Sequence, residues 1–267
     1  MEFLDKDNLY GNSYNAFSLC EYTKELDFLK RLINIADNAI QQKETVYTWS
    51  FEGVCYSIAK TIVDYSKMAY DNILLGHFHA VNMINRSVLE NGIFLDIIIN
   101  NYEHELWKYY WIHSCATPIL KSKTPKQSDL EMLQNMYKEL NISDDFYVTQ
   151  NGRYRAYIEE PYGWTYKINK DKKFTFKRIC KLAKSPTEYL GFQMMSEYSH
   201  GTSFCLKLHS SVFYCDMMNM FINMYINLYR MITLYCWDSA DDDFDEVAEE
   251  LEYIFYRYVE HEEDLWE

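Results

Sequence analysis

Three residue types that could act together on an anionic substrate stand in two separate segments of this chain. Arg86 and Glu90 are four residues apart, so a helix would place them on one face, one turn from each other. His200 lies far along the chain, directly before Gly201. A guanidinium can hold a phosphate, a carboxylate can orient it, and an imidazole can move a proton near neutral pH. If the segments converge, we expect Arg86, Glu90 and His200 to form a catalytic site.

The helix that would carry His200 is predicted to begin after Ser185. This serine is followed by a proline and, three residues on, by Glu188, which are typical start signals of a helix. Polar side chains then recur at steps of four, three and four and share one face. We expect this face and one upstream tryptophan to contact the substrate through Tyr189, Gln193, Ser196 and Trp164. A histidine before a glycine is also a common helix end, so a structural role for His200 stays open.

Arg86 and Glu90 have a structural interpretation as well. A buried ion pair can fix the packing of a helix without any part in binding. The order arginine-then-glutamate is the weaker one for helix stability, which makes helix stabilisation a poor reason for the pair. The sequence supports both interpretations about equally.

A second candidate surface is the basic stretch 167–184, which holds eight Lys and Arg against one acid, Asp171. Tyr166, Phe174 and Phe176 accompany it, a mixture that can hold phosphates and stack bases. An ordinary solvated basic face is the alternative. The basic residues are Lys167, Lys170, Lys172, Lys173, Lys177, Arg178, Lys181 and Lys184.

The net charge of −14 is concentrated at the C-terminal end. Residues 238–267 hold fourteen Asp and Glu against one arginine, so the remainder is close to neutral. This acidic segment could bind a basic protein partner, or it could shield the basic stretch within one chain or across a homodimer. It could also mimic nucleic acid, as some phage inhibitors do. A solvated acidic face is the simpler alternative.

Other kinds of site find no support in the sequence. It contains no zinc-protease, phosphate-loop, dinucleotide-binding or serine-hydrolase motif, and we expect no metal and no cofactor. The seven cysteines form no C-x-x-C pair, which favours buried free thiols. The N-terminal residues lack the features of a signal peptide, and polar side chains interrupt the most apolar run, 212–237. We therefore expect a cytoplasmic protein that does not enter membranes.

The composition favours an all-α fold. Eight glycines and four prolines are few for 267 residues, and long helices tolerate that scarcity better than a sheet does. Between 143 and 173 the helical spacing is lost, and turn signals with many aromatic residues predict a packed loop or a small hairpin. Elsewhere apolar residues recur at helical spacing, which predicts helices over 26–40, 51–70, 73–101, 103–115, 128–141, 174–183, 189–200, 210–235 and 244–258.

We predict a single helical-bundle domain of about seven to nine helices over residues 1–267, with the aromatic-rich insertion near 143–173 and an acidic C-terminal helix within 238–267. Within it, Asn72 is expected to end the second helix. Ser128 and Glu131 match a capping box, so Ser128 is expected to cap the helix that follows.

Several short motifs of this chain resemble the bacterial family of mainly helical proteins catalogued as domain of unknown function 5677. The resemblance covers roughly residues 50–235 and implies an all-helical fold in which Arg86, Glu90, Tyr189, Ser196 and His200 converge. It implies no established activity. The motifs are Arg86-Ser87-Val88-Leu89-Glu90, Pro161-Tyr162-Gly163-Trp164, Phe176-Lys177, Tyr189, Ser196 and His200-Gly201.

Two classes of function remain. Helical nucleases of toxin and phage-defence systems place an arginine a few residues before a histidine; this chain lacks that spacing, but Arg86 and His200 from separate helices could supply the same chemistry. The sequence therefore predicts an RNA- or nucleotide-directed effector in phage defence or the stress response, for which a ribonuclease-like reaction is one form. The alternative is a non-catalytic interaction or inhibitor module that acts through the acidic C-terminal tail.

Overall fold

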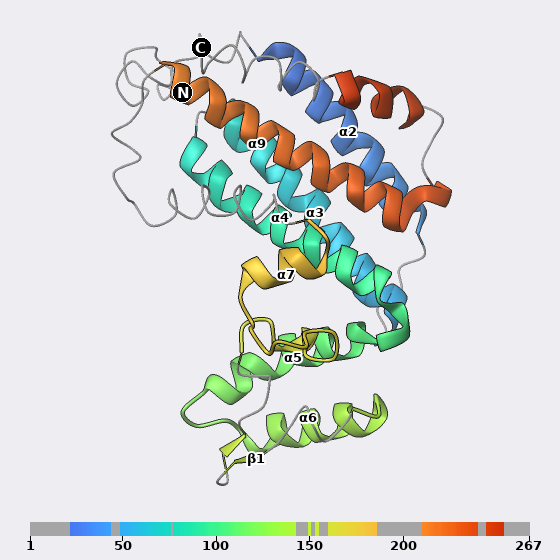
Figure 1. Ribbon diagram of the computed structural model, residues 1–267, viewed down its shortest axis with the longest axis vertical. Coiled ribbons are helices and arrows are strands. Elements are labelled where there is room, and N and C mark those ends of the chain that lie inside the picture. Colours follow the sequence, from blue (N-terminus) through green and yellow to red (C-terminus); the bar gives the residue numbers. More distant parts are fainter. Residues whose placement is uncertain are drawn as a thin grey trace. The chain divides into compact units, whose positions relative to one another are not determined.

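The protein is all-α, as predicted (Figure 1). A computed structural model describes residues 22–43, 49–75, 77–142, 149–150, 153–154, 160–185, 210–239 and 244–253. Seven labelled α-helices and an eighth over residues 244–253 lie in this part of the chain, within the predicted range of seven to nine.

The long helices are α2 (Thr23–Gln42), α3 (Phe51–Leu74), α4 (Phe78–Asn100), α5 (Leu106–Lys121), α6 (Gln127–Glu139), α7 (Phe176–Leu182) and α9 (Ser210–Met231). Short 3₁₀ turns are η2 (Tyr102–His104), η5 (Gly163–Thr165) and η8 (Trp237–Ser239), and η7 (Ile232–Cys236) is a π-helical turn. In the described part of the chain, no helix has the length and apolarity that a membrane crossing requires.

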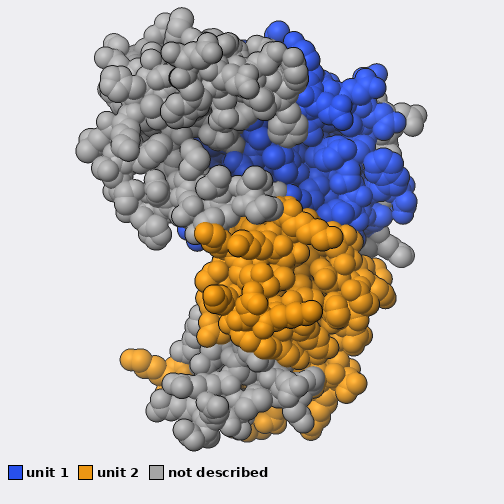
Figure 2. Space-filling view, in the orientation of Figure 1, with its two compact units in different colours: residues 1–44, 58–92, 190–267 blue, residues 45–57, 93–189 orange. Residues whose placement is uncertain are grey.

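The chain divides into two compact units, each of which joins segments distant in sequence (Figure 2). Unit 1 comprises residues 1–44, 58–92 and 190–267, and unit 2 comprises residues 45–57 and 93–189. Helices α3 and α4 contribute residues to both. The single domain over 1–267 stays a prediction.

In unit 1, α2 and α9 lie side by side (Figure 1). The inner face of α2 follows the predicted spacing, since Leu26, Ile33 and Ile40 are all buried. Against it, the ring of Tyr225 meets the ring of Phe28 edge-on, with centroids 4.8 Å apart. The Tyr225 hydroxyl donates a hydrogen bond of 2.7 Å to the backbone oxygen of Glu25. A buried phenol is thus packed by its ring and satisfied at its polar end.

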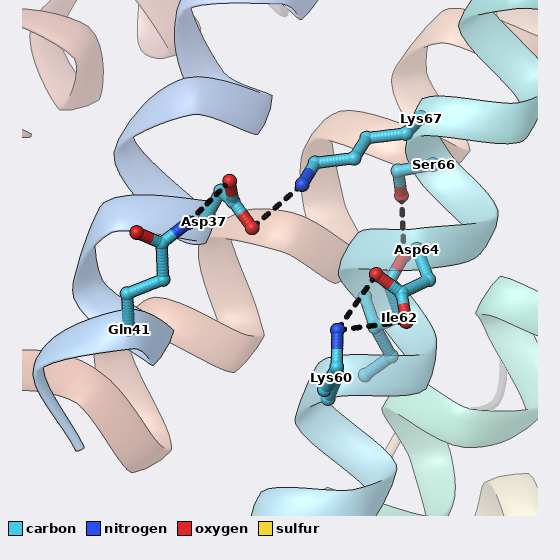
Figure 3. A network of polar contacts seen from close by, with 7 residues as sticks. All are labelled: Asp37, Gln41, Lys60, Ile62, Asp64, Ser66 and Lys67. Atoms are coloured by element: carbon cyan, nitrogen blue, oxygen red, sulfur yellow. Dashed lines mark hydrogen bonds and ion pairs between the residues drawn. The ribbon is translucent and has the colours of Figure 1, made fainter.

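Polar contacts tie α2 to α3 in the same unit (Figure 3). Lys67 Nζ lies 2.6 Å from Oδ1 of Asp37, and the other oxygen of this carboxylate accepts a hydrogen bond of 2.9 Å from Gln41 Nε2. The buried hydroxyl of Ser66 donates to the backbone oxygen of Ile62, one turn earlier in α3. The buried hydroxyl of Ser66 therefore has a hydrogen-bond partner, as most buried polar groups do.

Unit 2 has an aromatic core in which α5 packs against η5 and α6. The ring of Trp164 lies edge-on to Phe94 and to Tyr110, with centroid distances of 5.5 and 5.2 Å. Of the two alternatives predicted for 143–173, a packed loop or a small hairpin, the structure shows a hairpin of two two-residue strands, β1 (Thr149–Gln150) and β2 (Arg153–Tyr154), which pair antiparallel.

Several predicted helix boundaries were wrong. The helix predicted over 103–115 is α5, which begins at Leu106 and runs on to Lys121. α3 runs past Asn72 to Leu74, because the Asn72 amide turns back to the carbonyl oxygen of Met68 at 2.8 Å and remains within the last turn. Accordingly, α4 begins at Phe78 rather than near Ile73.

Ser128 does not cap α6. The N-cap is Lys126, which is extended and makes no capping hydrogen bond through its side chain. Ser128 already lies in the first turn of the helix. A cap residue needs non-helical backbone angles, so the serine stands too late to act as one.

The helix predicted over 210–235 changes its hydrogen-bond pattern before it ends. α9 stops at Met231, and the π-helical turn η7 follows. At this point the hydroxyl of Thr233 lies 3.0 Å from the backbone oxygen of Tyr229 and 3.1 Å from that of Arg230. Such side-chain bonds compete with the regular backbone ladder, which gives a local reason for the change.

Candidate functional site

Arg86 and Glu90 form an ion pair on α4. Arg86 Nε lies 3.7 Å from Oε1 of Glu90, a distance beyond ordinary hydrogen bonding. The two side chains are 31% and 25% exposed, so neither is sealed in the core. An ion pair sealed in the core would expose neither side chain. The pair can therefore be reached from solution, as a site for an anion must be.

A buried polar seam lies beside this pair, where α4 meets α9. Asn85, the residue before Arg86, is fully buried, and its amide nitrogen donates a hydrogen bond of 3.0 Å to the backbone oxygen of Met220. Among the described residues, the amide oxygen of Asn85 has no hydrogen-bond partner. The contact holds α4 at a defined position against α9, and Arg86 is carried by the same turn of the helix.

The seam continues at Gly92, two residues beyond Glu90. A Cβ atom built on Gly92 would lie 2.1 Å from Oδ1 of Asn227, so only glycine fits this close approach. Asn85 with Met220 and Gly92 with Asn227 have the same separation in sequence. The two helices therefore run parallel at this contact.

Polar residues in the C-terminal half of α9 are partly buried. Asn227 is fully buried, accepts a hydrogen bond of 3.1 Å from Arg230 Nη1 and donates one to the backbone oxygen of Asn223. Asn85, Gly92 and Asn227 were not among the residues predicted from the sequence to form a site. A glycine within a long helical pattern was the one signal that could have indicated the close contact.

Trp164 was predicted to contact the substrate. Its side chain is only 1% exposed, and it packs within the aromatic core of unit 2. Packing within this aromatic core is sufficient to explain a tryptophan at this position. A role in substrate binding stays a prediction.

The remaining predicted site residues, Tyr189, Gln193, Ser196 and His200, lie outside the described residues. Their helix over 189–200 and the convergence of His200 with Arg86 and Glu90 therefore stay predictions. The structure brings together one predicted pair, Arg86 with Glu90.

Two of the three aromatic residues that accompany the basic stretch are buried, and one of them, Tyr166, supports a lysine. Tyr166 and Phe176 are buried, with 7% and 4% of their surface exposed. Lys172 Nζ lies 5.3 Å from the ring centroid of Tyr166, a cation–π contact. Base stacking on these two rings is therefore excluded in this arrangement, whereas contact with phosphates is not.

The described thiols are poor nucleophiles. Burial raises the pKa of Cys55 to about 12, with a further contribution from Glu52, and burial raises the pKa of Cys236 to about 12 against the opposing charge of Lys43. Burial also raises the pKa of Cys115. Cys55, Cys115 and Cys236 therefore stay protonated near neutral pH. All four described cysteines are free; Cys55, Cys180 and Cys236 are buried, as expected, whereas Cys115 is partly exposed. No group of three His, Cys, Asp or Glu side chains that could hold a metal ion occurs within the described ranges.

Comparison with known proteins adds no relative. The chain matches no family model, no curated protein and no solved structure. The resemblance to domain of unknown function 5677 stays a prediction.

Proposed function

We propose that this protein is an RNA- or nucleotide-directed effector in phage defence or the stress response, with Arg86 holding a phosphate of the substrate. The observation that carries the proposal is the exposure of the Arg86–Glu90 ion pair, which lets an anion approach the guanidinium. Arginine suits this task because its planar fork matches phosphate oxygens. Glu90 orients the guanidinium from one turn away.

The contact between Arg86 and Glu90 by itself contributes little to the stability of α4. Exposed i,i+4 ion pairs contribute about 0.3–0.5 kcal/mol, and the pair's long contact and reversed order place it at the low end. The fold of unit 1 depends on its buried apolar residues instead.

In the proposed reaction His200 moves the proton, and Arg86 stabilises the charge that develops on the phosphate. Tyr189, Gln193 and Ser196 hold the substrate. A cut in RNA and the hydrolysis of a nucleotide both fit these roles.

Incubation of the protein with RNA and with nucleotides tests the proposal. We expect product from the wild type, and a loss of about 100-fold or more in rate from Arg86→Ala and from His200→Ala. Arg86→Lys keeps the charge but not the fork, so an intermediate loss is expected.

A matched control comes from a second i,i+4 ion pair of unit 1. Lys60 Nζ lies 3.0 Å from the Asp64 carboxylate on α3, and Lys60→Gln breaks that pair at a similar cost in stability. Its activity should equal that of the wild type. If the wild type and His200→Ala were equally inactive on every substrate, an enzymatic function would be refuted.

One observation favours the alternative of an acidic interaction module. In the helix over 244–253, Phe244, Val247 and Leu251 are buried at helical spacing, and Glu250 pairs with Arg31 of α2. The opposite face is acidic and exposed. This face consists of Asp245, Glu246, Glu249 and Glu252.

This arrangement decides how the alternative is tested. Deletion of residues 238–267 would remove core side chains together with the charges, so neutralisation is the cleaner change. Asp245→Asn, Glu246→Gln and Glu252→Gln, combined, should abolish binding of a lysine-rich peptide if the acidic face is the functional surface. Three other exposed acids of unit 1 provide the control when changed to Asn, namely Asp27, Asp64 and Asp71. Equal effects of the two triple variants would count against a specific acidic surface.

A further inference from the structure

The charges of this protein are divided unequally between its two units. Unit 2 contains fifteen Lys and Arg against thirteen Asp and Glu, a net charge of +2. Since the whole chain carries −14, unit 1 carries −16. The basic stretch 167–184 and the acidic C-terminal segment thus belong to different units. The negative total is therefore carried by unit 1, whereas unit 2 by itself has a small positive net charge.

Two lysines of the basic stretch are supported by a row of aromatic rings. Lys167 Nζ lies 4.4 Å from the ring centroid of Tyr109 on α5. The Tyr109 ring lies edge-on to the Tyr166 ring, with centroids 5.3 Å apart. Lys172 Nζ in turn lies 5.3 Å from the centroid of the Tyr166 ring. Both tyrosines are buried, so the row joins the basic stretch to the core of unit 2.

Polar bonds tie the turn of this stretch to α7. Arg178 Nη2 lies 3.0 Å from the carboxylate of Asp171, so the charge of the one acid in the stretch is offset locally. Arg178 Nε also donates to Oδ1 of the buried Asn169, whose amide donates a hydrogen bond of 2.9 Å to the backbone oxygen of Lys173. The lysines are thus presented by an ordered backbone, which lowers the entropy lost on binding.

Four lysines complete the surface. Lys170, Lys173, Lys181 and Lys184 are exposed, and their side chains make no ion pair within the described residues. Lysine ammonium groups act as point charges toward phosphates and read no base edges. With Tyr166 and Phe176 buried, base stacking on these two rings is excluded, and the exposed lysines offer contacts to the phosphate backbone.

We infer that the exposed lysines of residues 167–184 form an RNA-docking surface, which holds the phosphate backbone of the substrate without regard to its sequence. The choice of RNA rests on the proposed function. Lys170, Lys173 and Lys181 contact phosphates, while Lys167 and Lys172 hold the surface on its aromatic support.

The test is fluorescence anisotropy of a labelled RNA of about 20 nucleotides, long enough to cover such a surface. One variant combines Lys170→Gln, Lys173→Gln and Lys181→Gln, which leaves the aromatic row untouched. The matched control removes three other exposed lysines of unit 2, and combines Lys123→Gln, Lys126→Gln and Lys138→Gln. Both variants change the net charge of the protein equally.

We expect the first variant to bind RNA at least about tenfold more weakly, and its log K against log salt slope to fall by about 2, since each phosphate contact on a single strand contributes about 0.7. The control should bind like the wild type. Equal weakening by both variants would reduce the effect to total charge and overturn the inference. Absence of RNA binding by the wild type would overturn it as well.

Two further experiments distinguish an RNA-docking surface from a general polyanion-binding surface, and RNA binding from the proposed reaction. DNA of the same sequence and vesicles containing phosphatidylserine serve as competing polyanions, and tighter binding to either would overturn the assignment to RNA. His200→Ala removes the proposed proton transfer but no phosphate contact, so this variant should retain lysine-dependent RNA binding and lose the reaction. Lysine-dependent RNA binding without any His200-dependent reaction would therefore refute the proposed function alone, whereas a reaction that survives with lysine-independent binding would refute the docking surface alone.

Discussion

Gly92 on α4 and Asn227 on α9 touch so closely that a Cβ on the glycine would lie 2.1 Å from the amide oxygen of the asparagine. Helix propensity alone would make Gly92→Ala stabilising by about 1 kcal/mol. The contact reverses the sign, because Asn227 is buried and held by its own hydrogen bonds.

We predict that Gly92→Ala lowers the free energy of unfolding by about 1–3 kcal/mol, the usual cost of overpacking. Urea denaturation measures this loss. In an Asn227→Ala background the clash is absent, so the same change should be neutral or stabilising. If the effects of the two substitutions on the free energy of unfolding were additive, the two residues would not be in contact.

The helix over 244–253 is held by its apolar face more than by its ion pair. Leu251→Ala should cost about 2–5 kcal/mol, because it opens a cavity in a buried contact. Arg31→Gln removes the exposed pair with Glu250 and should cost at most about 1 kcal/mol. Hydrogen exchange of this helix reports both effects. A larger loss of protection in Arg31→Gln would reverse the ranking.

The buried thiols predict a loss of stability in alkali. The pKa of Cys236 is about 12 in the folded protein against a usual 9.0, so below pH 9 both the folded and unfolded states keep the proton. Between pH 9 and 12 the unfolded chain releases it first, and the free energy of unfolding falls by up to about 1.4 kcal/mol per pH unit for this thiol.

Cys236→Ala isolates this contribution. The variant is expected to be less stable than the wild type below pH 9, and the difference should shrink as the pH rises above 9. Urea denaturation at a series of pH values measures the difference. A constant gap across the series would mean that the folded thiol titrates normally.

Substitutions of Trp164 can separate a role in core packing from a role in substrate binding. Because its ring is packed among Phe94 and Tyr110, Trp164→Ala should cost about 3–5 kcal/mol, and Trp164→Phe less. If packing is its whole role, Trp164→Phe leaves the KM of the proposed reaction unchanged. A raised KM in a variant with wild-type stability would instead make Trp164 a substrate contact.

Local patterns in the sequence were sufficient for most of the helices. The spacing of Leu26, Ile33 and Ile40 predicted α2, because a helix that buries one face must repeat its apolar residues every three or four positions. The same argument predicted Arg86 and Glu90 as neighbours, since both lie on one helix one turn apart.

The tertiary structure decided which polar residues meet across helices and which are buried. Asn227 is one of the polar residues that interrupt the apolar run 212–237, yet it is buried and packs against Gly92. Tyr166 stands beside lysines in the sequence, yet the ring lies in the core and supports them. Periodicity along one segment describes that segment's own faces, whereas burial depends on the partner segment, and in this chain the partners α4 and α9 are far apart in sequence.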